Sequence, residues 1–207
     1  TIANALAAAG IHTPRNQEMV YPGTCRPSQP TPYSDELLAE TKKAWRIALP
    51  ENCQIQFEDL SLGTQSQDLN QEVGDFVLRR NDGLFTYQLA VVVDDAEQGI
   101  THIVRGQDLL NNTARQIYLQ NQLGYATPSY RHLPLVLDEH GEKLSKQTLA
   151  PAITAEEAAS WLLKALGFLG QTPPTELVSY SHIEILDWAK THWQLAKVPK
   201  QRNIVLA

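Results

Sequence analysis

The sequence is short of cysteine, of basic residues and of long apolar runs. These shortages argue against a disulfide-rich protein, a generally basic nucleic-acid-binding protein and a membrane-spanning helix. Two cysteines, Cys25 and Cys53, cannot form a disulfide framework, so they favour a reducing compartment or a metal site with few thiolates. Seventeen Lys and Arg residues stand against 23 Asp and Glu residues, giving a net charge of −6. This balance argues against nucleic-acid binding through general positive charge, although it leaves room for a local basic patch. No apolar run approaches the roughly 20 residues of a membrane helix.

The 207 residues are otherwise ordinary for a globular chain. Hydrophobic residues make up 43% of the sequence, enough for one compact domain or two small lobes. The chain begins at Thr1, its single methionine is Met19, and residues 1–10 are rich in alanine without a basic n-region. We therefore expect an incomplete piece of a cytoplasmic protein, with no secretory signal and no membrane partner.

The first 75 residues predict a small lobe with many loops. An alanine-rich helix is expected over 1–10, and prolines spread over 12–32 exclude long regular structure there. A helix is expected to start at Ser34 and to continue as far as Trp45. Short alternating stretches within 51–80, such as 55–57 and 76–78, predict strands that pair in antiparallel fashion.

The remainder of the chain predicts two regions of different secondary structure. Residues 76–150 alternate strands and helices, which predicts an α/β unit with a parallel sheet. Residues 151–207 predict a helical region that starts after Thr154, where Glu156 and Glu157 resemble a capping box. The expected elements are strands at 76–78, 103–105 and 132–137, helices at 88–95 and 113–123, a turn at 140–141, and helices that run to Gly167 or Gly170 and over 182–191.

Four segments of the middle region carry informative residues: Tyr87–Asp95 (YQLAVVVDD), Gly99–Asp108 (GITHIVRGQD), His132–Leu135 (HLPL) and Lys143–Gln147 (KLSKQ). Together they resemble the second half of the nucleotide-binding fold of class I aminoacyl-tRNA synthetases of the glutamyl type. The resemblance implies an α/β fold in which 76–150 form the second half of a Rossmann-type catalytic domain. It further implies a zinc-type insert lobe over 1–75, a C-terminal helical stem over 151–207, and L-glutamate and ATP with Mg²⁺ as ligands.

The segment Lys143–Gln147 resembles the lysine-bearing loop that closes on ATP in this family. When a carboxylate attacks the α-phosphorus of ATP, negative charge builds up as pyrophosphate leaves, and an ammonium group aimed at that charge lowers the barrier. The resemblance implies that Lys146 is the catalytic lysine and that Lys143 supports it. Leu144, Ser145 and Gln147 would complete the ATP-binding loop. Taken alone, the same string also fits a solvated turn.

Arg105 ends a predicted strand, at the sheet edge where open α/β folds bind ligands. The planar fork of arginine suits a carboxylate, and the resemblance implies that Arg105 and Tyr87 hold the substrate glutamate. Two structural alternatives stay open: Arg105 pairs with Asp108, or Tyr87 is a core aromatic. His132 lies beside the predicted ATP loop and is either a site residue or a packed structural histidine.

A zinc site follows only from the resemblance. One branch of the family carries a structural zinc in its insert, held by a Cys-x-Cys pair and then by a tyrosine and a cysteine. Tyr21 and Cys25 match the last two ligands, and the upstream pair is not found in this sequence. Cys53 matches nothing in that pattern and is interpreted as a buried thiol.

The same branch, the glutamyl-Q tRNA(Asp) synthetases, fits two further features. Only a short stretch follows Lys146, where ordinary glutamyl enzymes continue into an anticodon-binding region, and Val91 stands where those enzymes tend to carry asparagine. The implied partner is tRNA(Asp) carrying queuosine, and we expect a monomer. The family's first ATP-binding signature is absent, so we expect the first half of the active site to precede Thr1. The alternatives are a silent synthetase-like module that binds tRNA or protein, and a fragment of an ordinary glutamyl-tRNA synthetase.

Overall fold

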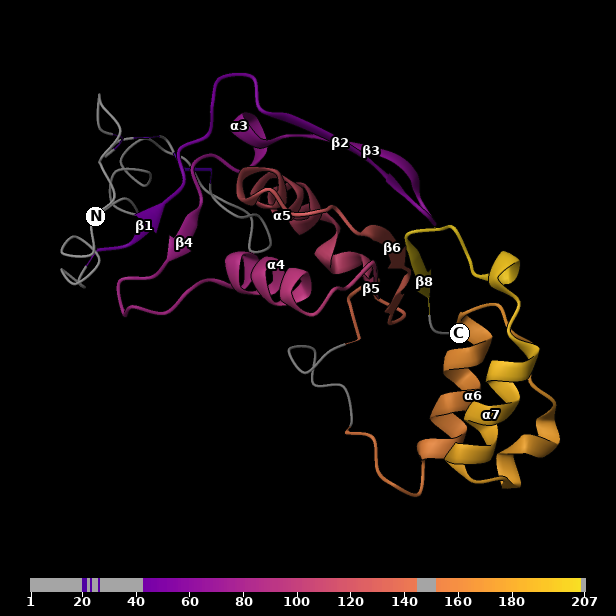
Figure 1. Ribbon diagram of the computed structural model, residues 1–207. Coiled ribbons are helices and arrows are strands. Elements are labelled where there is room, and N and C mark those ends of the chain that lie inside the picture. The colour runs from indigo at the N-terminus through magenta and orange to yellow at the C-terminus, as the bar shows by residue number, and fades with distance from the viewer. Residues whose placement is uncertain (1–19, 22, 24–25, 27–42, 145–151, 206–207) are drawn as a thin grey trace. The chain divides into compact units, whose positions relative to one another are not determined.

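The computed structural model describes residues 20–21, 23, 26, 43–144 and 152–205 (Figure 1). Contacts divide these residues into two compact units. The first contains the described residues up to Phe57, together with Ser66–Ile100 and Asn111–Thr127. The second contains Glu58–Gln65, Thr101–Leu110 and the described residues from Pro128 onward. The helix predicted over 1–10 and the start of the one predicted from Ser34 lie outside the described residues.

Two helices dominate the first unit: α4 (Tyr87–Glu97) and most of α5 (Leu110–Leu123) (Figure 1). Both were expected, over 88–95 and 113–123, and they share one buried cluster that contains Val92 of α4 and Ala114 of α5. Helix α4 ends where Gly99 adopts a positive φ of 67°, a conformation that favours glycine. The cluster also contains Leu49, Cys53, Leu69, Val73, Phe76, Tyr118 and Leu119.

Two short strands complete the packing around this core. β1 (Trp45–Arg46) pairs in antiparallel fashion with β4 (Val77–Arg79), which contains part of the strand predicted at 76–78, whereas β1 itself was not predicted. The predicted helix through Trp45 is wrong at its end, because the backbone of Trp45 is extended and bonded to β4. The one-turn helix α3 (Leu69–Glu72) is capped by the Asp68 side chain, which accepts hydrogen bonds from two backbone amides.

The main sheet has four strands in the order β3-β2-β6-β5. β5 (His102–Gly106) and β6 (Ser129–Leu133) are parallel and paired along their whole length, and β2 (Gln54–Asp59) joins β6 in parallel where Asp59 lies opposite Tyr130. β3 is Gly63–Asp68. The expected parallel α/β sheet is therefore confirmed for β5 and β6. The 55–57 stretch, which was expected in a separate antiparallel lobe, instead belongs to β2, which joins this sheet in parallel. A short 3₁₀ helix, η1 (Gln107–Leu109), follows β5 directly.

The strand predicted over 132–137 is in fact two strands. β6 ends at Leu133 and β7 (Leu135–Leu137) begins after Pro134, which has no amide hydrogen to donate to a sheet. β7 pairs in parallel with β8 (Asn203–Val205). After β7 the chain makes the expected turn, in which Gly141 donates to the carbonyl of Asp138.

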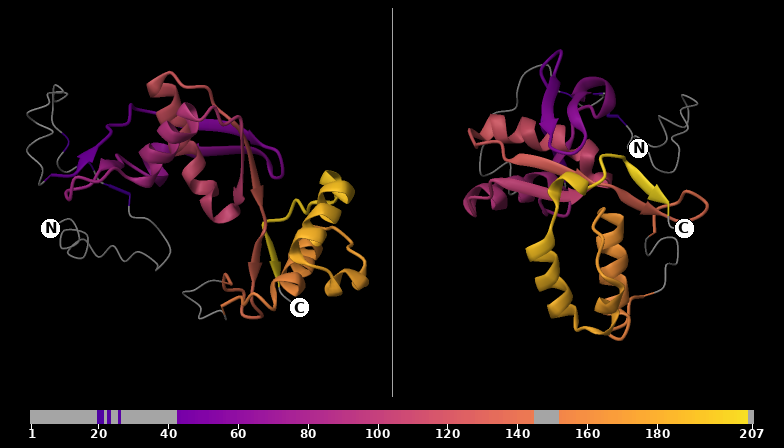
Figure 2. Two further views of the ribbon diagram at one scale, coloured as in Figure 1. Left: turned by 60° about the horizontal axis from the view of Figure 1, so that its bottom comes forward. Right: turned by 90° about the vertical axis from the view of Figure 1, so that its right-hand side faces the viewer.

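The C-terminal part is helical, as predicted. α6 (Ala158–Phe168) and α7 (His182–His192) lie side by side (Figure 2) and bury Leu166 against Ile185. A capping box at Ser181 and Glu184 starts α7. The short 3₁₀ helices η3 (Thr175–Ser179) and η4 (Leu195–Lys197) flank α7 along the chain. Among the described residues, no helix is both long and apolar enough to cross a membrane.

Candidate functional site

Arg105 lies where the sequence predicts it, near the carboxyl end of β5. Its Cα is paired with that of His132 on β6, so both side chains leave the sheet on the same face. The Arg105 Nε donates a hydrogen bond to Nε2 of His132 at 3.0 Å, and the guanidinium lies 5.3 Å from the centroid of the Tyr130 ring. The arginine is therefore held against a polar partner and an aromatic face.

Behind Arg105 lies a buried carboxylate that the sequence analysis missed. Asp59, at the end of β2, is 2% exposed, and His132 is 1% exposed. Asp59 Oδ2 lies 2.6 Å from His132 Nδ1 and accepts the His132 backbone amide at 3.0 Å. Asp59 Oδ1 accepts the amides of Ser61 and Leu62, each at 2.9 Å. The carboxylate thus accepts four hydrogen bonds, as a buried charge requires.

The charge state of His132 follows from these contacts. Burial lowers its pKa below the ordinary 6.5, and the positive charge of Arg105 acts in the same direction. The hydrogen bond that His132 donates to Asp59 and the charges of Asp59 and Asp108 oppose this shift without cancelling it. His132 is therefore neutral at pH 7, so Nδ1 carries the proton and Nε2 is an acceptor.

The first two residues of the predicted ATP loop are anchored beside this cluster. Lys143 Nζ lies 2.5 Å from Asp108 Oδ2 in η1, three residues after Arg105. Lys143 also forms an antiparallel bridge with Leu137, and Leu144 donates its amide to Val136 at 3.1 Å. Gly106 permits this approach, because a Cβ there would lie 2.6 Å from Asp108 Oδ1. Ser145, Lys146 and Gln147 lie outside the described residues.

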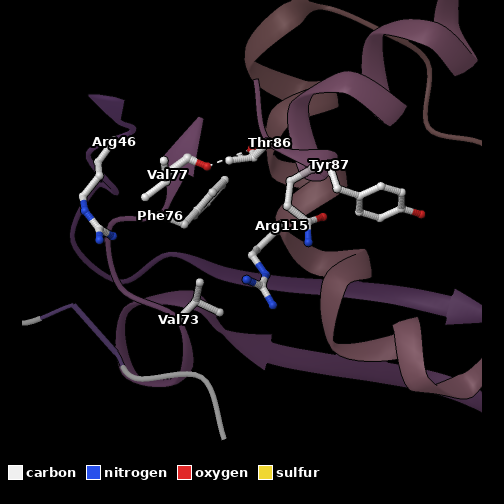
Figure 3. A pocket seen from close by; sticks show the side chains of 8 residues that line it. Arg46, Val73, Phe76, Val77, Thr86, Tyr87 and Arg115 are labelled. Atoms are coloured by element: carbon white, nitrogen blue, oxygen red, sulfur yellow. Dashed lines mark hydrogen bonds between the residues drawn. The ribbon is translucent and has the colours of Figure 1, made fainter. Parts of the chain in front are cut away.

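Tyr87, the other predicted glutamate ligand, belongs to the first unit. It opens α4, is 51% exposed, and lies at a hollow of about 340 Å³. Its ring points away from Phe76 and Arg46 (Figure 3), so it is not a core aromatic. The hollow is lined by Arg46, Val73, Phe76, Val77, Thr86, Tyr87, Gln88 and Arg115, a set with two guanidinium groups and no carboxylate.

A polar network that was not predicted from the sequence forms one wall of this hollow. Asn112 Oδ1 accepts hydrogen bonds from Gln88 Nε2 and from Arg115 Nη2, both at 2.8 Å. Gln116 Nε2 donates to Gln88 Oε1 at 3.0 Å. These amides connect α4 with α5 and hold the Arg115 guanidinium at the hollow, which therefore suits an anionic ligand.

The predicted zinc ligands are only partly described. Tyr21 forms a backbone bridge with Gly74, and the guanidinium of Arg46 lies 4.2 Å from the centroid of its ring. Cys25 lies outside the described residues. Within the part of the chain that the structure describes, no three His, Cys, Asp or Glu residues gather as a metal site would require. Cys53 is a buried free thiol, as expected.

Open α/β folds bind their ligands outside the carboxyl ends of parallel strands, and here Arg105 and the pair of Lys143 and Asp108 lie at such an end. The family of class I tRNA synthetases (E and Q), catalytic domain, matches residues 11–197, and the chain belongs to this family. The structure is similar to the crystal structure of a glutamate tRNA ligase from Elizabethkingia meningosepticum in complex with its amino acid. The TM-score is 0.62 and the identity 27%, over 83% of this chain and 38% of that one.

The similar curated proteins point to one branch of the family. A glutamyl-Q tRNA(Asp) synthetase of Thiobacillus denitrificans is 51% identical over 192 residues, which are 91% of this chain and 61% of the relative. The protein of the same name from Aromatoleum aromaticum is 51% identical over 187 residues, or 90% of this chain and 56% of the relative. The chain thus spans about three fifths of the length of these relatives.

Proposed function

We propose that this chain is part of an enzyme that activates L-glutamate with ATP and transfers it to queuosine in the anticodon of tRNA(Asp). The observation that carries the proposal is that η1 follows β5 directly, so that Arg105 and the partner of Lys143 are only three residues apart. Arg105 is the penultimate residue of β5, and Asp108 of η1 pairs with the ammonium of Lys143, the first residue of the predicted ATP loop. The names of the relatives support the choice of glutamate and of tRNA(Asp).

In this proposal each cationic group has a separate task. Arg105 and Tyr87 bind glutamate, and an oxygen of its carboxylate attacks the α-phosphorus of ATP. The bond to the bridging oxygen breaks, pyrophosphate leaves, and a mixed anhydride of glutamate and AMP remains. Lys146, supported by Lys143, stabilises the charge that develops on the phosphates. A hydroxyl of queuosine then attacks the carbonyl carbon and releases AMP.

Two metal ions enter the proposal through the family alone. Mg²⁺ would arrive with ATP and neutralise its phosphates. Zinc would be held by Tyr21 and Cys25 together with two cysteines that this sequence does not contain. Metal analysis of the complete translation product of the gene tests this prediction, because a product without stoichiometric zinc would contradict it. We further propose that the enzyme acts as a cytoplasmic monomer.

The decisive assay is exchange of labelled pyrophosphate into ATP by the complete translation product, with and without glutamate. We expect exchange that depends on glutamate and needs no tRNA. Transfer is then measured with tRNA(Asp) that contains queuosine, with the same tRNA lacking queuosine, and with tRNA(Glu). Charging of tRNA(Glu) would favour an ordinary glutamyl-tRNA synthetase. Binding of tRNA without any exchange would favour a silent module. The 207-residue chain by itself is expected to be inactive, because the family's first ATP-binding signature is not found in it.

A further inference from the structure

We propose that Asp59 and His132 are positioning residues that fix the Arg105 guanidinium in the orientation required for glutamate. This inference rests on the proposed function, since it assumes that Arg105 meets the substrate carboxylate. The three side chains form a line from the buried end of β2, through β6, to β5. Each link is a hydrogen bond between groups of defined donor and acceptor character.

The first link determines the tautomer of the imidazole. The Asp59 carboxylate can only accept, so the contact of 2.6 Å with Nδ1 requires a proton on that nitrogen. Because Asp59 also accepts three backbone amides, its position is set by the main chain of β6 and of the residues after β2. The backbone therefore determines which ring nitrogen of His132 is the hydrogen-bond acceptor.

The second link determines the orientation of the arginine. His132 Nε2, bare in this tautomer, accepts from Nε of Arg105 at 3.0 Å. With Nε used in this way, the terminal nitrogens Nη1 and Nη2 form the edge of the fork that can meet a carboxylate with two parallel hydrogen bonds. The Tyr130 ring, stacked on His132 with an interplanar angle of 9°, supports the guanidinium from one side.

This arrangement also makes the orientation dependent on pH. A proton on Nε2 would turn an acceptor into a donor that faces the Nε–H of Arg105, and the second link would break. The charged groups that face His132 are Asp59 from β2, Arg105 from β5 and Asp108 from η1. Acidification should therefore weaken glutamate binding before it affects ATP binding.

Two substitutions of His132 separate the two links. An asparagine places its amide near the position of Nδ1, so His132→Asn keeps the contact with Asp59 and loses the acceptor for Arg105. A glutamine reaches the position of Nε2, so His132→Gln keeps an acceptor for Arg105. In the complete translation product, we expect His132→Asn to raise the KM for glutamate about tenfold with little change in the KM for ATP. We expect His132→Gln to restore most of the affinity and to remove its decline at acid pH. His192→Gln, on α7, should leave the pH profile unchanged.

Arg105→Gln distinguishes failure of this inference from failure of the proposed function. If Arg105→Gln leaves the KM for glutamate unchanged, Arg105 does not bind the substrate and the proposed function of the site is wrong. If Arg105→Gln raises the KM while His132→Asn does not, the positioning role is wrong. Should the His132 variants fail to fold, ¹⁵N NMR of the unmodified protein decides. A proton on Nδ1 of His132 at pH 7 supports the inference, and a proton on Nε2 overturns it.

Discussion

The ion pair between Lys143 and Asp108 allows a structural role to be separated from a catalytic one. The two side chains are 47% and 38% exposed, and an exposed pair of this kind stabilises a fold by less than about 1 kcal/mol. A cation that stabilises transition-state charge contributes about 3 kcal/mol, or roughly a hundredfold in rate. Because the proposed function gives Lys143 a role that supports Lys146, we expect Lys143→Ala to lower glutamate-dependent exchange by about 10- to 100-fold. The free energy of unfolding of the Lys143→Ala variant should be lower than that of the unsubstituted protein by less than about 1 kcal/mol.

A matched control exists in the same chain. Lys190 pairs with Asp187 at 2.9 Å on the exposed side of α7, and Lys190→Ala removes a comparable surface contact. We expect its small effect on stability to equal that of Lys143→Ala and its effect on exchange to be absent. Urea denaturation measures the first quantity and pyrophosphate exchange by the complete translation product measures the second. The reasoning is refuted if Lys143→Ala exchanges at the unsubstituted rate, or if Lys190→Ala loses as much activity.

Three further predictions concern stability and reactivity. Gly170 has φ +73° and a Cβ there would lie 2.0 Å from the carbonyl oxygen of Lys197, so Gly170→Ala should cost more than about 2 kcal/mol. Gly63→Ala, with φ +72° and open space, should cost about 1 kcal/mol by thermal denaturation. The pKa of His132 is lowered in the folded protein, so an unfolded histidine binds a proton more readily near pH 6.5. The free energy of unfolding should therefore fall as the pH drops below that value. Urea titrations at pH 7.5 and 5.5 should show a smaller difference for His132→Gln than for the unsubstituted protein. Cys53 is 7% exposed and burial raises its pKa, so in Cys25→Ser protein it should react with a thiol reagent at least about 100-fold more slowly in the folded than in the unfolded state.

The elements that could be predicted from the sequence are those whose pattern is local. Helices α4 and α7 were predicted over 88–95 and 182–191, close to their observed bounds, and α7 carries Ile183 and Leu186 at helical spacing. Trp45 was assigned to a helix on the same kind of evidence, and the prediction failed because pairing with β4 outweighs a weak local preference. The division between β6 and β7 was readable in principle, since Pro134 cannot donate to a sheet.

The residues of the candidate site also divide into those that the sequence predicts and those that it does not. Arg105 and the start of the lysine loop carry motifs, so the sequence located them, whereas Asp59 carries none. It is a single acidic residue that follows a short strand, and its partner His132 is 73 residues away in the chain. A pattern within a window of a few residues contains no information about such a contact, because only the pairing of β2 with β6 creates it. The same holds for the amide network that joins Gln88 to Asn112.

Exposed residues such as Lys143 and buried residues such as Asp59 differ in how easily they are predicted, and this difference has a physical origin. Groups that bind a charged substrate must reach solvent, so they sit at strand ends and turns, where short motifs can be recognised in the sequence. Under the proposed function, Lys143 is such a group. Groups that hold them in place can be fully buried, and a buried polar group persists only if every hydrogen bond is supplied by the fold, as the four donors to Asp59 illustrate. Loss of one such donor should therefore disturb Arg105 more than loss of a solvent contact would, because inside the protein no water replaces it.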